Sequence, residues 1–81
     1  MEPYFVYILH SLKDNKYYIG STSNVENRLL FHNSGLQRST KNRIPFKLVY
    51  VEELPGKKEA LVREKQIKSY KCGEAFKKLL K

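Results

Sequence analysis

The residues best suited to chemistry begin with a basic pair, Arg28 and His32, in a segment expected to be helical. They are four residues apart, so both side chains project from one side of the helix. Such a pair can bind a phosphate and relay a proton. The alternative is that His32 is only a cation at a helix C-terminus, where the macrodipole favours positive charge. From these two residues alone, the alternative is the better supported.

A single carboxylate, Glu64, lies on the apolar side of a later helix. Ala60 and Leu61 lie four and three residues before Glu64, and Ile67 lies three residues after it. All three therefore share its side of the helix. A carboxylate in that position must be paired or must open into a cleft. The alternative is an i,i+4 ion pair with Lys68, worth about 0.3–0.5 kcal/mol. That pair would be equally good on the outer side, so it does not explain the position.

Two tyrosines, Tyr7 and Tyr18, fall in consecutive strands separated by the turn sequence of residues 13–16. If Asp14-Asn15 is a two-residue turn, the register puts both tyrosines on one face of the sheet, staggered along it. The alternative for each tyrosine alone is ordinary sheet packing.

The elements that would position these residues follow from the sequence pattern. Aromatic and β-branched runs predict strands at about residues 4–9, 17–20 and 46–52. Helices are expected from the N-cap candidates at 21–24 to about Asn33, ended by Gly35, then from about 57 to 70, and after Cys72-Gly73. The sequence therefore predicts one α+β domain over residues 1–81. Its mainly antiparallel three-stranded sheet is flanked by helices in β-β-α-β-α-α order.

The composition limits the class of protein. With 81 residues and 41% apolar side chains, the chain is too hydrophobic to be disordered. Cys72 is the single cysteine, which fits a reducing compartment, and we expect it to be a half-buried packing residue. The apolar N-terminal run lacks a basic region and is too short to span a bilayer. We therefore expect a soluble, cytoplasmic protein with no membrane partner.

The net charge of +8 is concentrated in one loop and the C-terminal third. Residues 1–35 balance to zero, residues 36–47 carry four basic side chains and no acid, and residues 57–81 carry nine basic and three acidic side chains. This distribution indicates a polyanion partner. The alternative is a solvated lysine-rich helix face. The candidate phosphate contacts are Arg38, Lys41, Arg43 and Lys68.

The ordered set of motifs resembles the GIY-YIG nuclease superfamily, most closely its small standalone bacterial members. The N-terminal domain of the excision-repair nuclease C subunit is a more distant relative. The resemblance covers about residues 4–70. It is carried by Phe5-Val6-Tyr7, Tyr18-Ile19-Gly20, Arg28, His32-Asn33-Ser34-Gly35, Arg43-Ile44-Pro45, Glu59-Ala60-Leu61, Arg63-Glu64 and Ile67-Lys68.

The resemblance implies roles for the tyrosines and the basic pair. Tyr7 would be the general base, or its relay, for an attacking water, and His32 would hydrogen-bond or deprotonate its hydroxyl. Tyr18 would orient the nucleophile or a phosphate oxygen, and Arg28 would stabilise the charged transition state. A free tyrosine has a pKa of about 10, and we expect Arg28, a metal and a proton acceptor to favour the phenolate of Tyr7.

The resemblance also implies a cofactor. Glu64 would hold a single Mg²⁺ or Mn²⁺ against the leaving 3′ oxygen, and Gly20 would give the backbone room to approach the site. No small-molecule cofactor is expected. Two positions depart from the family pattern: the glycine of the first motif is missing, and Phe76 lies near the place of a common asparagine.

Three functions are compatible with these residues. The first is a metal-dependent endonuclease that hydrolyses phosphodiester bonds in DNA, in repair or on branched or single-stranded substrates, alone or in a larger repair assembly. The second is a catalytically weak or inactive nucleic-acid-binding module. The third is a protein-interaction domain that binds an acidic partner. The five candidate catalytic residues together favour the first, because a binding module needs lysines but no carboxylate on an apolar stripe.

Overall fold

The computed structural model describes residues 3–36, 41–70 and 73–80. Its elements are β1 (Tyr4–Ser11), β2 (Tyr17–Thr22), α1 (Val25–Asn33), the 3₁₀ turn η1 (Lys41–Arg43), β3 (Phe46–Leu54), α2 (Lys57–Ser69) and α3 (Glu74–Leu79). The predicted α+β class and the β-β-α-β-α-α order are confirmed. Within the described ranges, no helix has both the length and the apolar character needed to cross a membrane.

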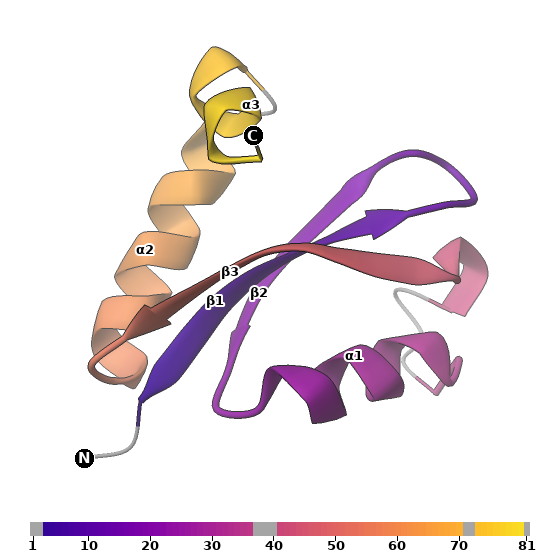
Figure 1. Cartoon of the computed structure of the whole chain (residues 1–81), viewed down its shortest axis with the longest axis horizontal. Helices are drawn as coiled ribbons and strands as arrows, with labels where there is room; N and C mark the ends of the chain where they lie inside the picture. The colour runs from indigo at the N-terminus through magenta and orange to yellow at the C-terminus, as the bar shows by residue number, and fades with distance from the viewer. Residues whose placement is uncertain (1–2, 37–40, 71–72, 81) are drawn as a thin grey trace.

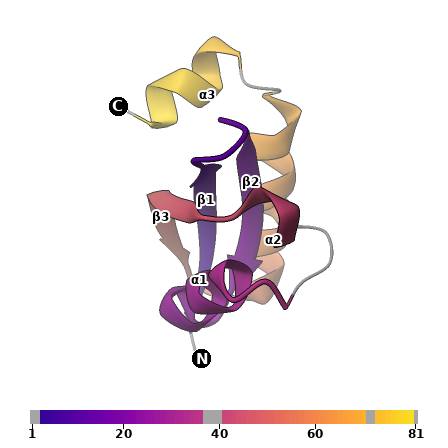
Figure 2. The same cartoon turned by 90° about the vertical axis from the view of Figure 1, so that its right-hand side faces the viewer.

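The sheet is antiparallel throughout, with β1 between β2 and β3. Helix α1 covers one face and α2 covers the other (Figures 1 and 2). Because successive side chains of a strand point to opposite faces, β1 contributes to two cores. Val6 and Ile8 pack with α2 and α3, whereas Tyr7 and Leu9 pack with Phe46 on the α1 side.

The β1–β2 register places Tyr7 opposite Gly20 and Leu9 opposite Tyr18. The two tyrosines therefore share one face and are staggered, as predicted. The prediction of a two-residue turn is wrong, because residues 12–15 form a longer loop closed by the Ser11 N–H, which donates to the Lys16 carbonyl at 2.9 Å. The side-chain oxygen of Ser11, a buried residue, accepts the N–H groups of Lys13 and Asp14, and these bonds favour the wider loop.

Helix α2 is held against β3 by a polar cluster. Arg63 Nε donates to Glu52 Oε1 at 3.1 Å, and the Tyr50 hydroxyl donates to the same oxygen. Ala60 and Ile67 are completely buried on the sheet side of the helix. Both kinds of contact fix the rotation of α2 about its axis, and hence the direction of Glu64, which follows Arg63.

Helix α3 completes the core on the α2 side. Phe76 is buried there, with its ring edge against the Tyr17 ring at a centroid distance of 5.1 Å. Phe76, which lies near the place where the resemblance leads us to expect an asparagine, is therefore a packing residue. Cys72, expected to be a packing residue, lies outside the described residues.

Candidate active site

The centre of the candidate site is a buried hydrogen bond between the Tyr7 hydroxyl and His32 Nε2 at 3.2 Å. Tyr7 is 2% exposed and His32 is completely buried. The Tyr18 ring lies 4.7 Å from the His32 ring and 6.4 Å from the Tyr7 ring, measured between centroids. Residues from β1, β2 and α1 thus meet at one point on the α1 face of the sheet.

Helix α1 is fixed at both ends, and this determines where His32 lies. At its start, the Asn24 side chain accepts the Asn27 N–H at 3.0 Å, which satisfies a backbone donor of the first turn. At its end, the Asn33 amide accepts the Phe46 N–H at 2.7 Å and donates to the Phe46 carbonyl at 3.2 Å. These contacts hold His32 over the strand face, where it packs edge-on to the Phe46 ring.

Gly20 makes room for the tyrosine hydroxyl. A Cβ at this position would lie 2.6 Å from Tyr7 Oη, 2.8 Å from Tyr7 Cζ and 3.2 Å from Tyr18 Cε1. The sequence predicted that the glycine lets the backbone approach the site. In the structure the space is filled by the Tyr7 side chain, which crosses the edge strand at this residue.

The electrostatic surroundings keep the hydrogen-bonded pair neutral. Burial, and secondarily Tyr18, raises the pKa of Tyr7 well above its ordinary value, although Arg28 opposes the shift. Burial, and then Arg28, lowers the pKa of His32. A neutral phenol facing a neutral imidazole is consistent with the observed contact. Among the protein groups alone, desolvation of the hydroxyl outweighs the guanidinium and favours the neutral phenol, so the phenolate expected beside a metal stays a prediction.

Arg28 and Glu64 come from α1 and α2, the helices on opposite faces of the sheet (Figures 1 and 2). Arg28 is exposed on α1 with its guanidinium carbon 5.7 Å from the Phe31 ring centroid, yet it influences the pKa of both Tyr7 and His32. Glu64 comes from α2 and raises the pKa of Tyr7 through its negative charge. The structure thus brings all the predicted catalytic side chains into electrostatic range of one hydroxyl.

Glu64 is also the candidate metal ligand, and its environment accepts a cation. Its side chain is 17% exposed, and Oε2 lies 2.7 Å from the Lys68 ammonium, whose side chain is 54% exposed. The ion pair considered as the alternative for Glu64 is therefore present. Among the described residues no cluster holds three or more His, Cys, Asp or Glu side chains. A cation here would have one protein carboxylate and retained waters, which is a donor set that suits Mg²⁺.

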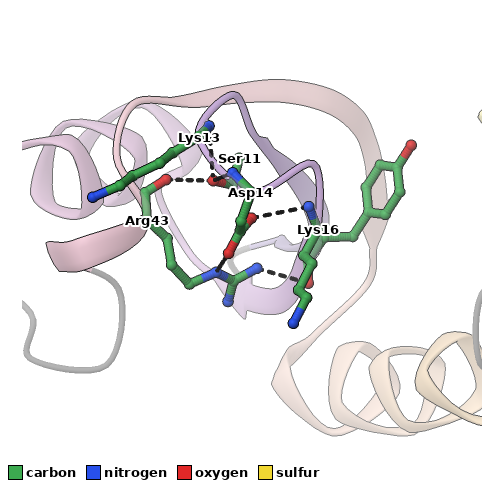
Figure 3. Close-up of polar contacts among 6 residues, drawn as sticks. Ser11, Lys13, Asp14, Lys16 and Arg43 are labelled. Atoms are coloured by element: carbon green, nitrogen blue, oxygen red, sulfur yellow. Dashed lines mark hydrogen bonds and ion pairs between the residues drawn. The ribbon is translucent and has the colours of Figure 1, made fainter.

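The structure gives Arg43, a predicted phosphate contact, a structural environment at the β1–β2 loop (Figure 3). Its Nε lies 3.0 Å from Asp14 Oδ2, its Nη2 donates to the Tyr17 carbonyl at 3.4 Å, and its own carbonyl accepts the Ser11 hydroxyl. The Lys16 N–H, and more weakly Arg43, lowers the pKa of Asp14. Arg43 therefore joins η1 to the hairpin, and phosphate binding by this residue stays a prediction.

The other predicted phosphate contacts differ in placement. Lys41 is exposed on η1, and Lys68 is exposed but paired with Glu64. Arg38 lies outside the described residues. The sequence interpretation missed the Ser11–Asp14 contact, although a serine three residues before an aspartate at a strand end is a signal for such a loop.

Comparison with known proteins identifies the class. The GIY-YIG catalytic domain family matches residues 3–72. The chain belongs to this family.

The relatives of this chain include small proteins, most of whose length it covers. UPF0213 protein SH2523 of Staphylococcus haemolyticus is 45% identical over 71 residues, covering 86% of this chain and 85% of that protein. UPF0213 protein CPE1444 of Clostridium perfringens is 46% identical over 65 residues, covering 79% and 69%. The solution structure of UPF0213 protein BH0048 from Bacillus halodurans is similar to this fold. Its TM-score is 0.52 at 35% identity, covering 94% of this chain and 79% of that one.

Proposed function

We propose that this protein is a divalent-metal-dependent endonuclease that hydrolyses phosphodiester bonds in DNA. The observation that carries the proposal is the buried Tyr7–His32 hydrogen bond beside Gly20. A core that needed only packing at this point would be served by Phe and Leu, without two polar groups to satisfy. Membership of the GIY-YIG catalytic domain family supports the same chemistry.

In the proposed reaction, a water oxygen attacks phosphorus and the bond from phosphorus to the 3′ oxygen breaks. Tyr7 accepts the proton of the attacking water as it passes its own hydroxyl proton to His32 Nε2. This relay avoids a free phenolate, which burial of the hydroxyl opposes. Arg28 binds phosphate oxygens as negative charge develops on them. Tyr18 orients the water or a phosphate oxygen.

The metal requirement assigns a role to Glu64. Its carboxylate would hold a single Mg²⁺ or Mn²⁺, replacing the exposed Lys68 ammonium that lies 2.7 Å away. The bound ion would supply positive charge at the leaving 3′ oxygen. Lys68, once released, would be available to a phosphate.

The charge of the chain supports DNA as the partner. The net charge is +8. Within the described part of the chain, Lys68 forms an ion pair with Glu64, whereas four other exposed lysines form none: Lys41, Lys57, Lys58 and Lys65. Binding to phosphates releases counterions, so affinity should fall steeply as salt rises. Action in repair, alone or within a larger assembly, is compatible with this chemistry.

A second candidate is a nucleic-acid-binding module with weak or no catalysis. Two specific observations favour it: Glu64 is already paired with Lys68, and the pKa of Tyr7 is raised. Both would slow a reaction that needs a free carboxylate and a basic phenol oxygen.

The Tyr7→Phe variant separates the two functions. Labelled duplex, single-stranded, flap and four-way-junction DNAs are incubated with Mg²⁺ or Mn²⁺, and binding is measured in parallel. For the nuclease, loss of the hydroxyl should slow cleavage by at least about 100-fold while binding changes less than about twofold. Tyr4→Phe, which removes a hydroxyl from the same strand on the other face, should cut normally. Binding without cleavage by the parent on every substrate would favour the module.

A further inference from the structure

One side of α1 forms a groove that the proposed reaction does not use in full. Residues 24, 27, 28 and 31 have the spacing of a single helix face, and Thr22 at the end of β2 lines the groove beside Asn24, to which it is hydrogen-bonded. The lining residues are Thr22, Asn24, Asn27, Arg28 and Phe31. The groove therefore shares Arg28 with the candidate active site and extends away from it along the helix.

Phe31 is the unusual member of this groove. Phe31 is 37% exposed, although the next residue of the same helix, His32, is completely buried. Its ring centroid is 6.1 Å from the ring of His32, which is hydrogen-bonded to Tyr7. An exposed aromatic ring thus lies directly beside a residue of the candidate active site.

The chemistry of the groove fits a flat, polar-edged aromatic group. Arg28 lies over the Phe31 ring with its guanidinium carbon 5.7 Å from the centroid, so a planar cation and a ring are held together at one wall. Aromatic rings and guanidinium planes both stack on nucleobases. The exposed Asn27 amide lies along the same wall and offers both a donor and an acceptor to a base edge.

We propose that this groove binds one unpaired DNA base next to the scissile phosphate, stacked on Phe31 and Arg28. The inference rests on the proposed nuclease function and specifies its substrate. A base inside a duplex is already stacked on its neighbours, and extruding it costs a few kcal/mol. The groove therefore selects single-stranded, frayed or branched DNA over an intact duplex. Stacking is tolerant of base identity, so no sequence preference follows.

The test compares Phe31→Leu with Phe31→Tyr by fluorescence anisotropy, using one labelled single-stranded oligonucleotide and a blunt duplex of the same sequence. EDTA is present, so that affinity is measured without cleavage. Phe31→Leu should weaken single-strand binding by about 5- to 100-fold, the range for loss of one base–aromatic stack. Duplex affinity should change less than about twofold. Phe31→Tyr, which keeps the ring, should bind as the parent does, and so should Leu30→Ala, which truncates a more exposed side chain of the same helix.

An abasic scan with the parent protein removes any concern about folding of the variants. A single abasic position, moved along the single strand, should weaken binding when it meets the groove, and this sensitivity should be absent in Phe31→Leu. Equal losses on single strand and duplex, or no loss on either, would overturn the inference.

Cleavage assays on the same DNAs distinguish failure of this inference from failure of the proposed function. If Phe31→Leu loses affinity only for the single strand but the parent protein cuts no DNA, the base-binding site is supported and the nuclease function is refuted. If the protein cuts DNA but cleavage depends neither on Phe31 nor on an unpaired base, the nuclease function is supported and the base-binding site is refuted.

Discussion

Gly20→Ala is the substitution whose effect follows most directly from the structure. The new methyl carbon would lie 2.6 Å from Tyr7 Oη and 2.8 Å from Tyr7 Cζ, whereas unstrained carbon contacts are about 3.5–4.0 Å. Either the ring or the edge strand must move by about 1 Å. The ring has little freedom, because Tyr7 is packed with Leu9 and Phe46 and is almost completely buried.

The magnitude follows from that displacement. Overpacking a core of this kind costs about 1–3 kcal/mol, and about 1 kcal/mol corresponds to 4–8 °C in Tm for a domain of this size. We therefore expect the Tm of Gly20→Ala to fall by at least about 4 °C. The Tyr7–His32 hydrogen bond is already 3.2 Å long, so a further 1 Å breaks it. Cleavage should fall by about 100-fold, as expected for a misplacement of that size.

The assay is thermal unfolding by circular dichroism, together with single-turnover cleavage of the preferred DNA. Ser21→Ala is the control, since it also ends in an alanine on the same strand but on the other face, where only a hydroxyl is removed and no carbon is added. It should change stability by less than about 0.5 kcal/mol and leave the rate unchanged. A Gly20→Ala protein with the Tm and rate of the parent would refute the placement of the Tyr7 hydroxyl over Gly20.

Further expected outcomes concern pH, the hairpin loop and the metal ligand. The pKa of His32 is lower in the folded protein than its ordinary value of 6.5. Below that pH the unfolded chain therefore binds more protons at His32 than the folded protein does, so stability is retained above pH 6.5 and declines below it. The Tm should therefore drop between pH 7.5 and 5, and the drop should be smaller in His32→Gln. Arg43→Ala should lower the Tm by a few degrees, because it removes the ion pair with Asp14, and prior substitution of Asp14→Ala should diminish this effect; an unchanged Tm would contradict the structural role of Arg43. If Arg43 also contacts a phosphate, as the sequence predicts, the same variant should bind DNA more weakly with little dependence on sequence. Lys68→Ala should strengthen Mn²⁺ binding, measured by calorimetry, about two- to fivefold, because an exposed ion pair worth up to about 1 kcal/mol no longer competes for Glu64. Equal affinity in the parent and the variant would mean that the ion does not bind at Glu64.

Local patterns in the sequence were enough to predict the positions of Tyr7 and Tyr18. Strand side chains alternate with a period of two, so any even change in hairpin loop length leaves both tyrosines on the same face. The predicted turn was too short by two residues, and the facial assignment still holds. The predicted face is right because it depends only on whether the error in loop length is even or odd. The loop length itself depends on the hydrogen bonds of the buried Ser11 hydroxyl.

The environments of the side chains were less predictable. Arg43 meets Asp14 across 29 residues of sequence, a contact that no local spacing encodes. The raised pKa of Tyr7 depends on how far its hydroxyl is buried beneath α1, which follows from packing. The resemblance to the GIY-YIG superfamily indicated which residues to expect at the site, and tertiary contacts decide which of them are charged and which charges are already paired.

Cleavage by Glu64→Gln, with Glu59→Gln as its control, is the measurement that decides whether Glu64 belongs to a nuclease site. Both glutamates lie on α2, but Glu59 is exposed in its first turn and Glu64 is the half-buried neighbour of the Tyr7 site. With Mg²⁺ or Mn²⁺ and labelled single-stranded, flap, junction and duplex DNAs, the parent and Glu59→Gln should cut at least one substrate at similar rates. Glu64→Gln should bind that DNA normally and leave it intact. Equal cleavage by Glu64→Gln would contradict the account of the site.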